Sequence, residues 1–141
     1  LYRTSEKDIR LKTEFDSKIS HIQVDKEQIK RAVVNLIDNS MEAMGGVGEI
    51  VVKTSINDEL DVVRIEIMDR GRGIPTEDKD RLFMPYFSTK KSGTGLGLAI
   101  VNKIVSDHNG YIRVSDNHPE GTIMTIELPI DTRAHSLRTT V

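Results

Sequence analysis

Alternating apolar and polar residues predict five strands in this chain. The first covers residues 9–15, where every second residue is charged, so the residues between them are expected to face a core. The same period of two appears in four later segments: residues 49–55, 61–68, 111–115 and 122–128. A hairpin loop over residues 56–60 joins the second strand to the third. The core-facing residues expected in the first strand are Ile9, Leu11, Thr13 and Phe15.

Helical spacing of apolar residues predicts two longer helices between the strands. Asp25 and Gln28 form a capping pair at the start of the first helix, and Gly45-Gly46 ends it. The second helix covers residues 98–108 and closes at Asn109-Gly110. The apolar residues that recur near helical spacing in the first helix are Ile29, Val33, Leu36, Ile37 and Met44.

Residues 69–97 separate the third strand from the second helix and contain five glycines and two prolines. This stretch is predicted to be an extended loop with one short helix over residues 76–83. Loops of this length are uncommon in compact domains and are often functional.

The order of these elements predicts an α+β sandwich. Strands and helices do not alternate strictly, and the hairpins favour a mixed, mostly antiparallel sheet with about three helices on one face. The domain core is expected over residues 25–130, preceded by a linker remnant and the first strand in residues 1–24. Residues 131–141 are polar and show no pattern, so they are expected to fray.

Composition excludes several classes of protein. A length of 141 residues suits one domain, and 37% hydrophobic with 30% charged residues is typical of a globular fold. The 20 basic and 22 acidic residues nearly cancel, so no nucleic-acid partner is expected. The absence of cysteine excludes thiolate metal sites and suits a cytoplasmic location. No apolar run approaches the ~18 residues of a membrane span, so no membrane contact by this domain is expected.

One stripe of the first predicted helix carries polar side chains that suit a metal ion. Asparagine is a mediocre helix former, so Asn35 and Asn39, one turn apart, weaken the helix unless they have another role. Amide oxygens are suitable ligands for Mg²⁺, which takes few protein oxygens together with phosphates and waters. A solvated face is the alternative interpretation. The whole stripe is Gln28, Arg31, Asn35, Asn39 and Glu42.

Asp69 continues the inward-facing side of the third strand, where the strand ends. A carboxylate that points toward the core must be hydrogen-bonded, and an amino group of a ligand would satisfy it. Thr122 is placed to help if the last strand turns it inward. The alternative is a self-contained turn in which Asp69 accepts from the amides of residues 70–73.

Residues 93–98 (GTGLGL) lead directly into the second helix and favour phosphate binding. Glycines leave backbone amides unhindered, and the start of a helix attracts anions. Lys90 and Lys91 would add positive charge. The signal is weak by itself, and the run is neither a P-loop nor a dinucleotide fingerprint.

Four segments in order resemble the boxes of histidine kinases. Residues 35–39 (NLIDN) resemble the asparagine box, and residues 69–75 (DRGRGIP) the first glycine box. Residues 82–87 (LFMPYF) resemble the phenylalanine box, and residues 93–98 the second glycine box. The resemblance covers residues 25–129, and the wording at residues 87–90 is closest to the nitrogen-regulation branch.

This resemblance implies a Bergerat ATP-binding sandwich with a mobile lid over residues 76–94. Asn39 would coordinate Mg²⁺, with Asn35 close to the metal and phosphates, and Asp69 would accept the adenine amino hydrogen. Both asparagines would be catalytic. The residues that would bind ATP are Asn35, Asn39, Ala43, Asp69, Gly71, Gly73, Ile74, Phe87, Lys90, Thr94, Gly95, Leu96, Gly97, Leu98 and Thr122.

The resemblance also implies the fate of the phosphate. ATP-hydrolysing members of the superfamily resemble one another in a glutamate where this chain has Asn35, and an amide cannot take a proton. The γ-phosphate is therefore expected to pass to a histidine. None of the four histidines in this chain lies in a phosphoacceptor motif, so dimerisation helices are expected to precede residue 1 in the parent protein, and a response regulator to act downstream.

Three alternative functions remain open. The chain could be an ATP-driven switch of the gyrase or chaperone kind, or an anti-sigma serine kinase. Both classes usually carry glutamate in place of Asn35. A nucleotide-binding regulatory module without catalysis is the third, and no sequence feature excludes it.

Overall fold

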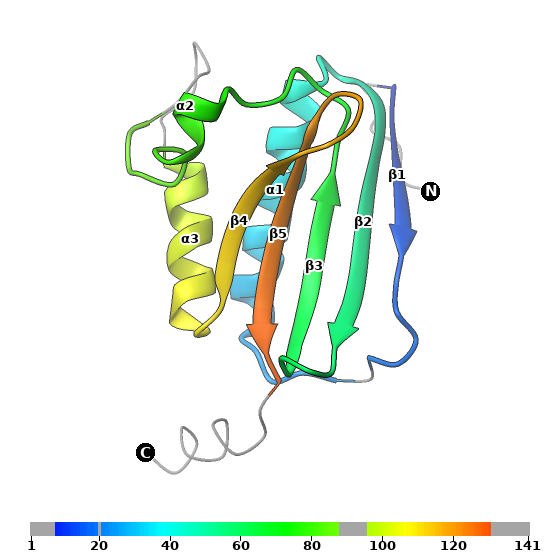
Figure 1. The fold of residues 1–141 in the computed structure, drawn as a ribbon, viewed down its shortest axis with the longest axis vertical. Coiled ribbons are helices and arrows are strands. Elements are labelled where there is room, and N and C mark those ends of the chain that lie inside the picture. Colours follow the sequence, from blue (N-terminus) through cyan, green and yellow to red (C-terminus); the bar gives the residue numbers. More distant parts are fainter. Residues whose placement is uncertain (1–7, 20, 88–95, 131–141) are drawn as a thin grey trace.

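A computed structural model describes residues 8–19, 21–87 and 96–130 and shows one five-stranded sheet backed by helices (Figure 1). The strand order in the sheet is β1-β2-β3-β5-β4. β1 runs parallel to β2, and all other neighbours are antiparallel. The predicted α+β sandwich with a mixed, mostly antiparallel sheet is confirmed. The strands are β1 (Asp8–Glu14), β2 (Val47–Asn57), β3 (Val62–Met68), β4 (Tyr111–Asp116) and β5 (Thr122–Pro129).

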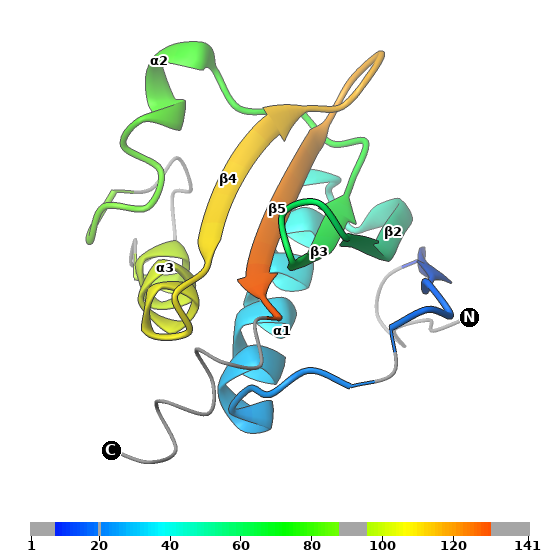
Figure 2. The same cartoon turned by 60° about the horizontal axis from the view of Figure 1, so that its bottom comes forward.

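The helical layer consists of α1 (Lys26–Ala43), α3 (Gly97–Asp107) and the short α2 (Thr76–Lys79). α1 and α3 contact each other and run in opposite directions across the same face of the sheet (Figures 1 and 2). As a result, the end of α1 and the start of α3 lie at the same end of the molecule, which is the upper end in Figure 1. In the described part of the chain, no helix is long and apolar enough to cross a membrane.

The core fills the space between the sheet and the two long helices. Every second residue of β3 and β5 faces it, as the period of two predicts. Leu36 of α1 and Val101 of α3 are completely buried. The other large side chains with almost no exposed surface are Ile9, Ile50, Ile67, Val105, Ile126 and Leu128.

The boundaries of α1 follow from its flanking residues. The Asp25 carboxylate accepts a hydrogen bond from the Gln28 backbone N–H at 3.1 Å, which confirms the predicted cap. Gly45 and Gly46 adopt positive φ values of 69° and 85° immediately after the helix, a conformation that glycine tolerates best. The predicted end of the helix is therefore also confirmed.

Three local predictions are corrected by the structure. Thr13 and Phe15 were expected in the core, but both are exposed: only Ile9 and Leu11 of β1 are covered, and Phe15 (65% exposed) lies beyond the end of β1 at Glu14, where the chain turns at Asp16. Asp16 binds the end of β2: its N–H donates to Thr54 Oγ1, and its Oδ2 accepts from the Ile56 N–H. The short helix ends at Lys79 instead of residue 83, and β2 extends through Asn57, so the hairpin loop is shorter than predicted.

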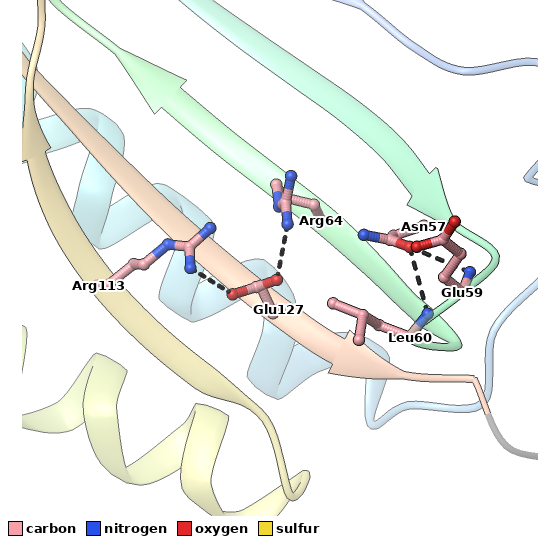
Figure 3. A network of polar contacts seen from close by, with 6 residues as sticks. All are labelled: Asn57, Glu59, Leu60, Arg64, Arg113 and Glu127. Carbon is pink, nitrogen blue, oxygen red and sulfur yellow. Dashed lines mark hydrogen bonds and ion pairs between the residues drawn. The ribbon is translucent and has the colours of Figure 1, made fainter.

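The sheet face turned away from the helices carries an ion network across three strands (Figure 3). Glu127 of β5 pairs with Arg64 of β3 at 3.0 Å and with Arg113 of β4 at 3.1 Å. Among the described residues, Arg64 Nε is buried without a hydrogen-bond partner.

In the β2–β3 turn, Asn57 Oδ1 accepts from the N–H groups of Glu59 and Leu60.

Candidate functional site

Asp69 lies at the end of β3 and is the most buried acidic residue of the described chain. It is 4% exposed, which confirms the inward orientation predicted from the strand pattern. Its Oδ1 accepts a hydrogen bond from the Gly71 N–H at 2.9 Å and another from the Thr122 N–H at 3.2 Å. The carboxylate is thus held partly by its own turn and partly by β5, so the self-contained turn describes only half of its contacts.

Gly71 brings the turn after β3 into contact with the end of α1. A Cβ at Gly71 would lie 2.7 Å from the carbonyl oxygen of Ala43. The Arg72 N–H donates to that same oxygen at 3.3 Å. Only a residue without a side chain allows this approach. Ala43, Asp69 and Gly71, which the resemblance implies as ATP-binding residues, therefore lie together and form one wall.

Gly73 and Ile74 continue this wall. Gly73 has a φ of 76°, and a Cβ there would lie 3.6 Å from the carbonyl oxygen of Gly121, next to Thr122. Ile74 is half-buried and packs against the hydrophobic core. The ammonium group of Lys79 donates to the carbonyl oxygen of Ile74 at 2.9 Å and pairs with Asp116 at 3.0 Å. This second contact ties the start of the long loop to the end of β4.

Asn35 and Asn39 lie on α1 and are half-buried. Gln28, Arg31 and Glu42 of the same stripe are exposed. The stripe is therefore not a uniformly solvated face, because its two asparagines are partly covered. Both lie in the half of α1 that ends beside Gly71.

The start of α3 lies at the same end of the sheet (Figure 1). Its N-cap residue is Leu96, whose side chain has no polar atom to accept from the amides of the first turn. No described atom lies within 4 Å of the position that a Cβ of Gly97 would occupy. Leu98 is half-buried. Of the predicted phosphate-binding residues, Lys90, Thr94 and Gly95 lie outside the described residues.

Phe87 is half-buried against the core, and the Arg81 guanidinium lies 4.9 Å from the centre of its ring. Phe83 also packs against the core. The part of the predicted lid that the structure describes therefore has aromatic residues in contact with the domain, whereas residues 88–95 lie outside the described chain.

Sequence patterns missed one residue in particular at this site. Asn117, in the turn between β4 and β5, donates from its side-chain amide to the carbonyl oxygen of Asp69 at 2.8 Å. The two residues are 48 positions apart, so no local periodicity relates them. The only sequence signal is an asparagine before a Pro-Glu-Gly turn.

The geometry agrees with known proteins. Residues 24–132 match the family described as histidine kinase-, DNA gyrase B- and HSP90-like ATPases. The solved catalytic domain of histidine kinase ThkA has a TM-score of 0.76 and 35% identity to this chain, covering 86% of this chain and 79% of that one. The chain belongs to the histidine kinase catalytic domains. A structure of ThkA in complex with the response regulator protein TrrA matches with 31% identity and a TM-score of 0.74, covering 89% of this chain and 35% of that one.

Longer kinases contain this catalytic domain as one part. The sensor histidine kinase ZraS of Escherichia coli (strain K12) is 36% identical over 125 residues, which are 89% of this chain and 26% of ZraS. The sensory histidine kinase/phosphatase NtrB of Vibrio alginolyticus is 34% identical over 136 residues, which are 89% of this chain and 39% of NtrB. NtrB is thus one relative among several, and the nitrogen-regulation branch is not singled out.

Membership of this ATPase family implies that the catalytic domain binds ATP. In the described residues, 8–19, 21–87 and 96–130, no group of three His, Cys, Asp or Glu side chains is placed to hold a metal ion. The polar groups that α1 offers are the half-buried amides of Asn35 and Asn39. Such a donor set fits Mg²⁺ that arrives with nucleotide phosphates and does not fit a metal centre formed by protein side chains alone.

Proposed function

We propose that this histidine kinase catalytic domain binds Mg-ATP at the upper end of the sheet and presents the γ-phosphate to a histidine of its parent protein. The observation that carries the proposal is the buried Asp69 carboxylate, whose Oδ1 is held by two backbone amides. A carboxylate fixed in this way recognises a hydrogen-bond donor at one position. The exocyclic amino group of adenine is such a donor.

In this proposal the adenine lies against the wall that the turn after β3 forms with the start of β5. Asp69 accepts the adenine amino hydrogen, and Thr122 lies beside it, since its N–H already donates to Asp69 Oδ1. Gly71 and Gly73 lie in this wall, where they bring the turn after β3 close to Ala43 and to Gly121. The remaining residues assigned to this half of the site are Ala43 and Ile74.

The triphosphate extends toward the start of α3, where amides of the first helical turn and the adjoining glycines bind the phosphate oxygens. Residues assigned to this half are Phe87, Lys90, Thr94, Gly95, Leu96, Gly97 and Leu98. Asn35 and Asn39 orient the phosphates from α1, and Asn39 is the proposed ligand of Mg²⁺. When bound, Mg²⁺ neutralises the charge of the phosphates during transfer.

The chemistry of Asn35 determines the acceptor. A side-chain amide orients a nucleophile or phosphate but does not remove a proton from water. Positioning and charge stabilisation therefore dominate, as in phosphoryl transfer generally. The nucleophile in this proposal is a histidine on dimerisation helices of the parent protein, and a response regulator receives the phosphate afterwards. The complex of ThkA with a response regulator supports this partner. We also propose a cytoplasmic location for the domain.

Calorimetric titration with a non-hydrolysable ATP analogue and Mg²⁺ tests the site. Asp69→Asn removes the adenine acceptor, and Asn39→Ala removes the metal ligand. We expect both to weaken binding by about tenfold or more, which is the size of one charge-assisted hydrogen bond. Asn102→Ala is the matched control, because Asn102 is exposed on α3. Wild-type affinity in both variants, with the fold retained, would refute the site.

Phosphotransfer is tested by supplying the parent's dimerisation helices with labelled ATP. Label on the helices supports the kinase function. ATP binding without any label would favour a nucleotide-binding regulatory module.

A further inference from the structure

The turn between β4 and β5, together with the start of β5, forms hydrogen bonds with the main chain of Asp69. The Asn117 side-chain amide donates to the Asp69 carbonyl oxygen at 2.8 Å, and the Asp69 N–H donates to the carbonyl oxygen of Thr122 at 2.9 Å. Asp69 lies one residue beyond the end of β3. Its backbone is thus held on both sides after the regular strand has ended.

The orientation of the Asn117 amide is determined by its own turn. Its Oδ1 accepts from the His118 N–H at 2.9 Å, so its Nδ2 is the group that faces Asp69. The Asn117 N–H donates to the carbonyl oxygen of Gly121 at 3.0 Å and closes the turn. Both ends of this side chain are therefore occupied, and rotating the amide would lose both contacts.

The turn also approaches Asp69 too closely for any side chain in between. Gly121 has a φ of 115°, and a Cβ there would overlap the carbonyl oxygen of Asp69. A reciprocal contact runs in the other direction, because Arg70 Nη1 donates to the carbonyl oxygen of His118 at 3.0 Å. The turn after β3 and the β4–β5 turn are therefore joined by one side chain from each, Arg70 and Asn117.

We propose that Asn117 is a positioning residue for base recognition, and that it sets the preference of the site for adenine over guanine. This inference rests on the proposed function, in which the Asp69 carboxylate accepts from the base. Adenine presents an amino donor to the carboxylate, whereas guanine presents a carbonyl oxygen at the same ring position and is repelled. Discrimination of this kind requires that the carboxylate cannot turn away. The Gly71 and Thr122 N–H groups hold the carboxylate itself, and Asn117 fixes the backbone from which that carboxylate projects.

The experiment compares the affinities of non-hydrolysable ATP and GTP analogues, with Mg²⁺, in variants of the whole chain. Asn117→Ala removes the amide. Asn117→Asp has nearly the same shape and keeps the acceptor for the His118 N–H, but it replaces the donor with a negatively charged oxygen that faces the Asp69 carbonyl oxygen. Asn57→Ala is the matched control, because the Asn57 side chain also holds a hairpin turn (Figure 3). The β2–β3 turn lies at the end of the sheet opposite to the β4–β5 turn (Figure 1).

We expect both Asn117 variants to lose about three- to tenfold in affinity for the ATP analogue, the equivalent of one hydrogen bond. Affinity for the GTP analogue falls less or rises, so the ratio between the two decreases. Asn57→Ala lowers the melting temperature and leaves the ratio unchanged. A merely structural Asn117 would behave like Asn57, and an unchanged ratio in both Asn117 variants would overturn the proposal.

Asp69→Asn in the same assay separates this inference from the function beneath it. A reduced ratio in Asp69→Asn and in the Asn117 variants supports both. A reduced ratio in Asp69→Asn alone overturns the role of Asn117 and leaves the adenine site intact. An unchanged ratio in Asp69→Asn overturns both, because the carboxylate then does not read the base.

Discussion

Replacing Gly71 by alanine tests the contact that joins α1 to the turn after β3. The added Cβ would lie 2.7 Å from the carbonyl oxygen of Ala43, 2.8 Å from its carbonyl carbon and 2.9 Å from its Cβ. Non-bonded carbon atoms normally lie roughly 3.5 to 4 Å apart. Because all three neighbouring atoms belong to the end of a helix, none can rotate away.

The cost follows from what must move. Either the end of α1 or the turn after β3 has to shift by several tenths of an ångström, and both choices stretch the 3.3 Å hydrogen bond from the Arg72 N–H to Ala43. Overpacking of this kind costs about 1 to 3 kcal/mol. With a urea dependence of about 1 to 3 kcal/mol per molar, the midpoint of unfolding should fall by roughly 1 M.

Urea denaturation followed by circular dichroism measures this change, and Gly97→Ala is the matched control. No described atom lies within 4 Å of a Cβ at Gly97, which is the first residue of α3. Alanine there is expected to be neutral or to stabilise by up to ~1 kcal/mol, because it restricts the unfolded chain. If Gly71→Ala cost no more than Gly97→Ala, the close approach would have no energetic meaning and the reasoning would be refuted.

Three further substitutions test other parts of the structure. His108→Ala should lower the free energy of unfolding by about 1 to 2 kcal/mol, because His108 Nε2 accepts from the Asp25 N–H and its Nδ1 contacts the Ile104 carbonyl oxygen. Thermal denaturation measures the loss, and an unchanged melting temperature would contradict this link between α3 and α1. Glu127→Gln should destabilise by about 1 to 2 kcal/mol, and less in high salt, because it leaves the two paired arginines without their shared anion; equal losses at both salt concentrations would exclude an electrostatic cause. Asn35→Glu should raise phosphate release from ATP by about tenfold, below the roughly 10²- to 10⁴-fold of an evolved general base, and Asn35→Gln should not.

Patterns that depend on neighbours in the sequence predicted most of the fold. The Asp25 cap, the glycines after α1 and the inward side of β3 each involve residues within a few positions of one another, and the structure confirms them. Asp69 was found in this way, because the period of two continues one residue past the strand. The order of the predicted elements also indicated the α+β sandwich, and the resemblance to histidine kinase boxes added the expected ATP-binding role.

Features that depend on distant segments were missed or mispredicted. Phe15 has the correct alternation for a core residue but lies beyond the end of β1. Periodicity within a strand does not indicate how much of that strand the helices cover. No sequence pattern assigned a contact to His108, whereas it bridges the end of α3 to the start of α1. Asn117 meets Asp69 only after β4 and β5 have formed their hairpin. In each case the information lies in the packing of elements and not within one element.

The contacts around the site differ between its two halves, and this difference has a functional consequence. On the proposed adenine side, Asp69 is held by Gly71, Thr122 and Asn117 through hydrogen bonds of 2.8 to 3.2 Å. On the proposed phosphate side, α3 begins at Leu96 without a side-chain cap, and no described atom crowds Gly97. A prearranged base site lowers the cost of ordering on binding, whereas the amides at the start of a helix attract phosphate. Substitutions around Asp69 should therefore change which base binds, and substitutions around Gly97 and Asn39 should change how strongly binding depends on the phosphates and Mg²⁺.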